Sequence, residues 1–425
     1  MSNNVSAKSL GFFSILSLCV GTMVGVGILI APNMLYKFGK YGHFAWPVAS
    51  LMCLGLALMF SRLSQMTHSS GPAGFVHDAF GHLPSFQVGW SHWLGFTIAQ
   101  GIISYAFGQY VSPYVNPFFG YDVSFMLSIG ALWITTMISC FLTIFSVSVV
   151  MMITALKVLV LTAVIVFGLP YLNLQTITSL PNLTGDATSS FISAMSGCLL
   201  AFIGLEVATI PSGNVINPKV TIPAATIVAT IIAGVLYTLS YAVVGSAMPQ
   251  AELAVSNAPM IDAAIKFMGP IGGVMLTALG GLGFFASING MLYGQVYILK
   301  YLSQIRTLPA MFMKETKAGF PYMGALLSAI CSTGILILIF SDKIYLGKCG
   351  ALSTCFVSIA YLWSVGAYRF LGGSTLLWLI NLFTSIAFMA GSVIDAVDLI
   401  PIVVLGYCAS FFLYGLFVKT DRLSQ

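Results

Sequence analysis

Charged residues are scarce in this sequence. Only 6% of its 425 residues are Asp, Glu, Lys or Arg, whereas 58% are hydrophobic and the mean hydropathy is +0.99. Because a soluble globular protein carries roughly 25% charged residues, this composition predicts a protein that crosses the membrane many times. The sequence also lacks the basic tract or phosphate-binding loop of nucleic-acid and nucleotide binders, so we expect no nucleic-acid partner.

Metal-site and catalytic patterns are missing as well. The eight cysteines have no CxxC spacing and lie mostly in apolar stretches, which favours small buried side chains over disulfides or metal ligands. The five histidines lie mostly in loops and form no cluster at one depth, so we expect no metal, no cofactor and no enzymatic activity. A channel would show a polar stripe or a charged ring along several helices, and the sequence shows neither.

Apolar runs of about 20 residues, the length that crosses a bilayer, occur twelve times. They cover 12–34, 43–66, 86–111, 123–145, 148–170, 190–211, 222–247, 271–299, 321–340, 350–368, 374–394 and 400–417. The polar breaks between them are short, so residues 1–425 are predicted to form one polytopic membrane domain. The first run is too long for a cleavable signal and is expected to stay in the protein.

The distribution of lysines and arginines predicts that both termini are cytoplasmic. Twelve spans put the termini on one side, and ten basic residues lie on that side against five on the other. The ten are Lys8, Arg62, Lys219, Lys300, Arg306, Lys314, Lys317, Arg369, Lys419 and Arg422. The five are Lys37, Lys40, Lys266, Lys343 and Lys348. Lys37 and Lys40 directly follow the first span, so the charge close to the N-terminus favours the opposite orientation, but the count over the whole chain outweighs it.

Two spans are interrupted in the middle. The first carries three glycines in the run Gly21–Gly27, and the sixth carries Gly204 and Glu206, followed by Pro211 and Gly213. Glycine weakens a helix, and an unwound membrane helix is tolerated only where it is buried in protein or lines a cavity. Interruptions five spans apart are expected when two five-helix halves form an inverted repeat around a substrate site. The halves would be 10–170 and 190–370, with 374–417 as two additional helices.

Only two charged residues lie deep inside predicted spans. Lys157 is in the fifth span and Glu206 in the sixth. A charged side chain in hydrocarbon costs several kcal/mol, so such residues normally face the bundle interior and take part in transport or proton transfer. The alternatives are a structural partner pair, or a lysine whose ammonium reaches the interface. We favour a functional role for both.

The interrupted spans resemble those of the amino acid–polyamine–organocation superfamily of transporters, and in particular its bacterial basic amino acid/polyamine antiporters. Besides Gly21–Gly27, the resemblance rests on the motifs Phe202–Glu206, Asn217–Lys219, Ile222–Ala224 and Gly71–Phe75. It extends from about residue 10 to the end of the tenth span. It implies an all-α fold of leucine-transporter type, with twelve membrane helices in a 5+5 inverted repeat.

The resemblance also implies a substrate site. The amides of Gly25, Val26 and Gly27 would hold the substrate carboxylate at a helix N-terminus, and the carbonyls of Met23, Leu200 and Ile203 would accept from its ammonium. Further candidate substrate-binding residues are Gln100, Phe202, Gly204 and Asn289. Tyr361 and Trp363 in the tenth span are candidate pocket walls, and the alternative for both is an anchor at the membrane interface.

This sequence departs from the arginine-transporting members at several of these positions. Those proteins have a serine where Val26 stands and tryptophans where Leu200 and Asn289 stand. An aromatic face contributes about 0.5–2 kcal/mol to guanidinium binding, and Leu200 cannot supply it. Gln100 keeps one polar contact. We therefore expect arginine to be a poor substrate and a neutral or smaller amino acid to be preferred.

Lys157 differs from the small apolar residue of the arginine-transporting members. Some proton-coupled or exchanging members carry a lysine here, where sodium-driven relatives bind sodium. A desolvated ammonium can release its proton during transport. Glu206 is expected to gate the cytoplasmic side, with His92 facing it as a pH-sensitive partner. A simple interfacial histidine is the alternative for His92.

The sequence thus predicts a secondary active amino acid transporter of the bacterial inner membrane that works by proton coupling or exchange and does not need sodium. Its partners would be an amino acid or a polyamine, protons and the lipid bilayer, and a homodimer is possible by resemblance. An amino acid/polyamine antiporter is the alternative function, and a transporter-derived sensor is a remote one.

Overall fold

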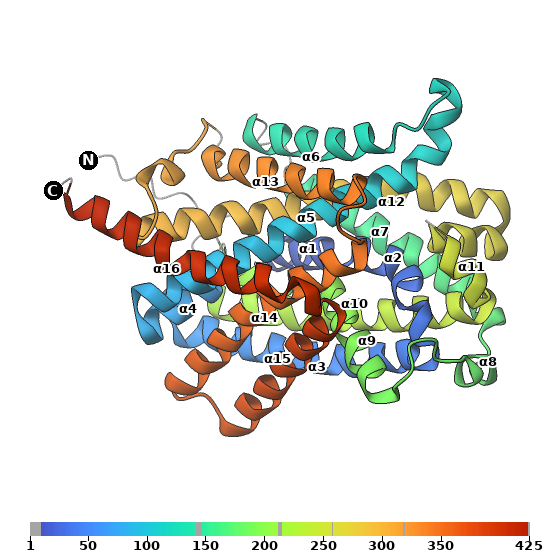
Figure 1. Cartoon of the computed structure of the whole chain (residues 1–425), viewed down its shortest axis with the longest axis horizontal. Helices are drawn as coiled ribbons and strands as arrows, with labels where there is room; N and C mark the ends of the chain where they lie inside the picture. The colour runs from blue at the N-terminus through green and yellow to red at the C-terminus, as the bar shows by residue number, and fades with distance from the viewer. Residues whose placement is uncertain (1–9, 142–146, 211–214, 257, 318, 424–425) are drawn as a thin grey trace.

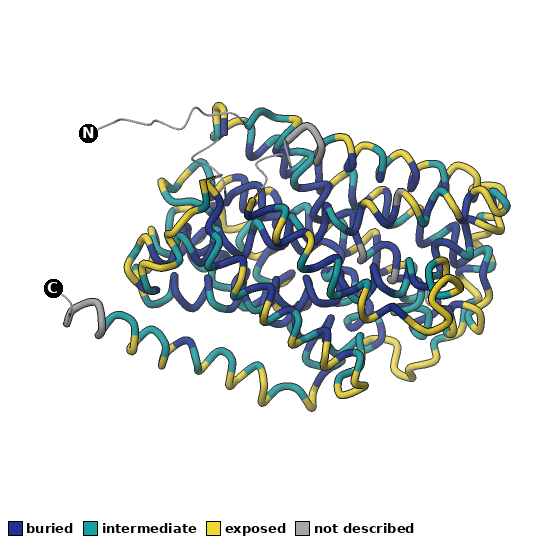
Figure 2. The backbone as a smooth tube through the Cα atoms, turned by 90° about the horizontal axis from the view of Figure 1, so that it is seen from above, coloured by how far each residue is buried: buried dark blue, intermediate teal, exposed yellow. Residues whose placement is uncertain are grey.

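The computed structural model describes residues 10–141, 147–210, 215–256, 258–317 and 319–423. Within these ranges the chain is almost entirely helical and has no strand beyond two isolated bridges. Figure 1 shows the long helices side by side, with their axes close to one direction. In Figure 2 buried residues fill the middle of the bundle and exposed residues its ends and outer surface. The predicted all-α membrane bundle is confirmed.

The helices coincide with the predicted spans to within a few residues at most ends. In chain order they are α1 (Phe12–Met23) with α2 (Val26–Leu35), α3 (Lys40–Met66), α5 (His82–Phe119), α6 (Ser124–Phe141), α7 (Val147–Gly168), α9 (Ala187–Phe202), α10 (Pro218–Ala247), α12 (Pro259–Gln304), α13 (Tyr322–Phe340), α14 (Leu346–Phe370), α15 (Thr375–Asp395) and α16 (Ile400–Leu423). The predicted eighth span covers only part of α12, which extends past a non-helical residue, Gly269, at φ 70°.

Eleven segments of the described ranges are long and apolar enough to cross a membrane, one fewer than the sequence predicted. The remaining predicted span, 86–111, lies within α5. This helix has 38 residues, but its polar side chains lower its hydropathy. Gln87, His92 and Gln100 are all buried within the bundle, so they would not meet lipid. The length and packing of α5 suit a membrane helix, and the total of twelve stays a prediction.

Both expected interruptions are confirmed. Between α1 and α2, Val24 (φ −71°, ψ 78°) and Gly25 (φ −135°, ψ −127°) leave the helical conformation. After α9 the chain runs through four residues into a single 3-10 turn, η3 (Val207–Thr209). The predicted positions Pro211 and Gly213 lie outside the described residues.

Short helices occupy corresponding places in the two predicted halves. The helix α4 (Gly71–Phe80) follows α3, the second span of the first half. The helix α11 (Gln250–Val255) follows α10, the second span of the other half. The order of elements therefore repeats after each broken helix, as an inverted repeat would require. The limits 10–170, 190–370 and 374–417 stay a prediction.

The outer surface of the bundle is apolar, which suits contact with lipid. Large exposed side chains on the long helices include Phe118, Ile134, Leu376 and Phe412. Six of the eight cysteines are buried, in agreement with their role as small packing residues. The C-terminal helix α16 runs along the outside of the bundle (Figure 2) and is held mainly by α5, where the Trp90 indole donates to the Gly406 carbonyl at 2.9 Å.

Candidate functional site

The two interrupted helices meet deep inside the bundle. Gly204, in the second break, has φ 106°, and a Cβ atom there would lie 2.5 Å from Cγ2 of Thr22 in α1. At Gly27 a Cβ would overlap Ala201 of α9, and at Gly25 it would overlap the Ser287 hydroxyl of α12. These glycines are therefore required by close approach as well as by backbone freedom. Gly25, Gly27 and Gly204 bring α1, α2, α9 and α12 to one junction.

A tyrosine that the sequence did not single out joins the two breaks. The hydroxyl of Tyr237 in α10 lies 2.6 Å from the carbonyl oxygen of Met23 and 2.8 Å from that of Ala201. Met23 ends α1 and Ala201 precedes the end of α9, so one side chain connects both interrupted helices. The Met23 carbonyl also accepts from the Gly25 amide at 2.7 Å. Both of its lone pairs are thus in use, and so is the Gly25 N–H, in the conformation seen here.

Lys157 of α7 is buried beside the first break. Its Nζ donates to the Gly21 carbonyl at 3.0 Å and contacts the Ser287 hydroxyl at 3.2 Å. The same Ser287 hydroxyl also lies 3.1 Å from the Gly21 carbonyl. The ammonium therefore links α7, α1 and α12 at one point. Ser287 was not predicted, because a serine inside an apolar helix gives no signal of its own.

Glu206, at the second break, is completely buried and bound on both carboxylate oxygens. Its Oε1 lies 2.5 Å from Nε2 of His92 in α5, and its Oε2 accepts from the Tyr361 hydroxyl of α14 at 2.7 Å. The structure thus brings Glu206 and His92 together across 114 positions of sequence. The hydroxyl of Tyr361, a candidate pocket wall, donates to Glu206 and is therefore not available to a substrate in this conformation. Trp363, the other candidate wall, instead points its indole N–H to Tyr407 of α16.

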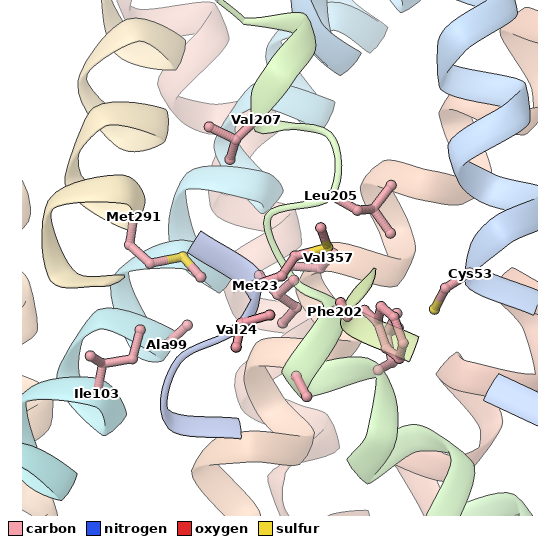
Figure 3. Close-up of a cluster of buried hydrophobic side chains, with 14 of the residues drawn as sticks. Met23, Val24, Cys53, Ala99, Ile103, Phe202, Leu205, Val207, Met291 and Val357 are labelled. Carbon is pink, nitrogen blue, oxygen red and sulfur yellow. The ribbon is translucent and has the colours of Figure 1, made fainter. Parts of the chain in front are cut away.

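The remaining side chains at the first break are apolar. Figure 3 shows Val24 between Ala99 and Ile103 of α5 and Met291 of α12 on one side, and the second break on the other. The second break contributes Leu205 and Val207, and α14 contributes Val357. All of these side chains are buried. We call Val24, Ala99, Ile103, Leu205, Val207, Met291 and Val357 the apolar junction.

Several predicted substrate-binding side chains are turned elsewhere. Phe202 packs against Tyr237 and Trp46, with ring centroids 5.0 and 6.5 Å apart. Asn289 accepts from Ser139 of α6 at 2.8 Å, whereas Ser287 and Gly290 are the α12 residues that face the α1 segment.

Both ends of the Gln100 amide contact protein groups. Its Oε1 accepts from Gln295 at 3.1 Å and from Ser332 at 3.0 Å, and its Nε2 donates to the Ile288 carbonyl. Ile203 is buried at the end of α9, and its amide donates to the Leu199 carbonyl. The side chain of Val26 lies outside the described part of the structure, although its backbone begins α2.

Two pockets lie at opposite ends of the bundle. The α9–α14 pocket lies near the end of α2, and its lining includes Lys37, Leu200, Lys348, Thr354 and Asp395. The α4–α12 pocket lies beyond the far end of α3, and its lining includes Ser70, Gly71, Ile210, Lys300 and Tyr301. Between them the apolar junction and the Glu206 cluster are buried, so neither end pocket reaches the junction. A small cavity between α2, α7 and α12 does touch the first break, and its lining includes Gly25, Lys157 and Phe284.

Comparison with known proteins gives a consistent picture. A sequence profile of the family described as amino acid permease matches residues 10–418. The cadaverine/lysine antiporter of Escherichia coli (strain K12) is 26% identical over 380 residues, which cover 85% of this chain and 82% of that protein. The putrescine transporter PotE of the same strain is 24% identical over 352 residues, covering 80% and 78%.

Among solved structures, Mhp1 is similar in fold. This nucleobase-cation-symport-1 family transporter, solved in a closed conformation with bromovinylhydantoin bound, has a TM-score of 0.62 against this chain. The match covers 98% of this chain and 96% of Mhp1 at 12% sequence identity. At that identity the likeness supports a common fold and says nothing of the substrate.

Proposed function

Because the chain belongs to the amino acid permease family of the amino acid–polyamine–organocation superfamily, we propose that it is a secondary active amino acid transporter of a bacterial inner membrane. The observation that carries the proposal is the junction of two broken helices deep inside the bundle. Substrate sites in such folds lie where the broken helices meet. Transport would proceed by alternating access, in which the α9–α14 and α4–α12 pockets connect in turn with that junction.

The start of α2 is the place we propose for the substrate carboxylate. The first amides of a helix have no partner within it and attract anions, and here they belong to Val26 and Gly27. The amide of Gly25 becomes available only if its bond to Met23 breaks. The substrate ammonium would bind the carbonyls of Leu200 and Ile203, and that of Met23 once Tyr237 releases it.

Lys157 supports transport without sodium. Its ammonium already lies at the Gly21 carbonyl and the Ser287 hydroxyl, and these oxygens would otherwise be suited to a hard cation. A buried ammonium in this position would supply a positive charge without a metal, and it could release a proton during the cycle. We therefore propose proton coupling or exchange.

Glu206, His92 and Tyr361 are proposed to form a latch on the side of the second break. Opening a path through the latch requires the carboxylate to part from the imidazole or the phenol. We propose that the pairing of Glu206 with His92 makes the latch pH-sensitive.

Uptake into proteoliposomes tests the function. Purified protein is reconstituted, and accumulation of each radiolabelled amino acid is measured with potassium or sodium outside, with and without an inward proton gradient. We expect saturable uptake of at least one amino acid, equal in the two salts. An absolute sodium requirement would contradict the role of Lys157. No uptake of any amino acid, either into empty vesicles or into vesicles loaded with amino acids and amines, would contradict the function.

Exchange of an amino acid for its amine is the second candidate, because the relatives named above are a cadaverine/lysine antiporter and a putrescine transporter. Loading the vesicles with a counter-substrate separates the two modes. An antiporter stalls in empty vesicles, whereas a proton-driven symporter does not. The cytoplasmic position of both termini and a homodimer stay predictions.

A further inference from the structure

We propose that the substrate is a neutral amino acid with an apolar side chain, and that basic amino acids and diamines are rejected. This inference rests on the proposed function and adds the substrate class to it. It separates this chain from the relatives named above, because cadaverine, lysine and putrescine all carry a second amino group. Three independent features of the structure support it.

The first feature is the chemistry of the apolar junction. A carboxylate bound at the start of α2 would place the side chain of the substrate among Val24, Ala99, Ile103 and Met291, which surround the break (Figure 3). None of these side chains has a hydrogen-bonding oxygen or nitrogen. An apolar pocket of this kind rejects a charged side chain, because the charge loses its hydration and finds no partner.

The second feature is that the acidic side chain at the breaks is already occupied. A diamine or lysine needs a carboxylate for its second ammonium. Among the described residues Glu206 is the carboxylate at the breaks, and both of its oxygens are bound, by His92 and by Tyr361. Taking Glu206 for a second ammonium would leave buried His92 and Tyr361 unpaired, which is costly.

Aromatic faces do not replace that carboxylate. A cation can bind over an aromatic ring, and Phe202 is the aromatic residue of the second break. Its ring packs against Tyr237 and Trp46 on the α3–α10 side, away from Ala99 and Met291 (Figure 3). Leu200, which lines the α9–α14 pocket, has an aliphatic side chain and cannot bind a cation in this way.

The third feature is the charge of the two pockets. The charged residues that line the α9–α14 pocket in the described structure are two lysines, Lys37 and Lys348, and one aspartate, Asp395. The α4–α12 pocket has Lys300. Routes for dications are expected to carry an excess of carboxylates, because surface charge of the opposite sign raises the local concentration of substrate. Neither pocket has that excess.

The experiment is a competition panel on the wild-type protein in proteoliposomes. Leucine, methionine, valine and alanine are compared with lysine, arginine, cadaverine and putrescine, first as labelled substrates and then as internal counter-substrates. We expect uptake of the neutral apolar group to exceed that of the basic group by about 100-fold or more, the order expected for an unpaired buried charge.

The outcomes separate this inference from the function it rests on. Efficient lysine, cadaverine or putrescine transport would overturn the substrate class and leave amino acid or polyamine transport intact. Preference for an acidic or a polar neutral amino acid would overturn it as well. No transport of any compound would overturn both.

A matched pair of variants tests the location. Met291→Glu adds a carboxylate to the apolar junction and Met291→Gln adds an uncharged group of the same shape. We expect Met291→Glu to gain lysine uptake relative to Met291→Gln, while leucine uptake falls in both. If both variants take up lysine alike, the apolar junction does not surround the substrate side chain. Folding is checked by gel filtration, and the wild-type panel decides the substrate class whether or not the variants fold.

Discussion

Lys157 donates a hydrogen bond to the carbonyl of Gly21, 136 positions away in sequence, at a distance of 3.0 Å. This contact fixes a positive charge two residues before the last residue of α1. The close packing of α1 on α7 also requires a glycine at position 21. A Cβ there would lie 2.7 Å from the hydroxyl of Thr154, which is one turn before Lys157 on α7.

Replacing Lys157 should abolish coupling. In Lys157→Ala we expect accumulation of substrate against its gradient to fall at least about tenfold, the size of a typical coupling between sites, because the ammonium no longer links α7, α1 and α12. The measurement is proton-driven uptake into proteoliposomes. Lys343→Ala, an exposed lysine on a loop, is the control and should behave as wild type. Full accumulation by Lys157→Ala would refute a coupling role.

The Glu206 latch makes a prediction about pH. In His92→Gln the ionisable ring is replaced by an amide, so the transport rate should vary less with pH than in wild type. His77→Gln is the control, since His77 lies on α4 and has a half-buried side chain next to Asp78. Initial rates at fixed substrate and fixed membrane potential give the profile. An unchanged profile in His92→Gln would show that His92 does not set it.

Gly204 should be intolerant of any side chain. Gly204→Ala combines a positive φ of 106° with a Cβ 2.5 Å from Thr22, and we expect it to lose about 1–3 kcal/mol of stability. Gly130→Ala is the control, because nothing lies within 4 Å of its Cβ and it lies within α6. It should be neutral or slightly stabilising. Thermal melting of the purified proteins compares them, and equal melting temperatures would contradict the packing described here.

Tyr237→Phe should weaken the link between the two broken helices. It removes the hydroxyl that binds both the Met23 and Ala201 carbonyls and keeps the ring that packs on Phe202. We expect a loss of about 1 kcal/mol in stability and a larger change in transport rate than in Tyr121→Phe, an exposed loop residue. Melting and initial uptake rates are measured on the same preparations. Transport equal to that of Tyr121→Phe would mean that the bridge is not part of the cycle.

Much of the fold followed from the sequence. The spans are recognisable because lipid demands long apolar runs, and the two breaks because glycine clusters are conspicuous within them. Lys157 and Glu206 stood out for the same reason, since a charge in such a run has a high cost. The contact of Glu206 with His92 came from family resemblance and could not have been derived from either residue alone.

The direction in which each side chain points could not be predicted from the sequence. Successive residues on a helix differ by about 100°, so Asn289 and Gly290 face different neighbours although they are adjacent. Tyr237 and Ser287 were missed because a single tyrosine or serine in an apolar helix has no distinguishing pattern. Their roles depend on which helices pack together, and that is a property of the whole bundle.

The length of α5 has a consequence for how the bundle is anchored. A helix of 38 residues is about 57 Å long, whereas the whole bilayer with its headgroups is about 40–45 Å thick. It must therefore tilt or project into water, and Figure 1 shows it running diagonally across the bundle. It packs on α4, α6, α12, α13, α14 and α16. As a long tilted helix, α5 would hold α12 and α14 in fixed positions relative to each other. Small rotations of the broken helices against α12 and α14 would then open the bundle at the membrane surface.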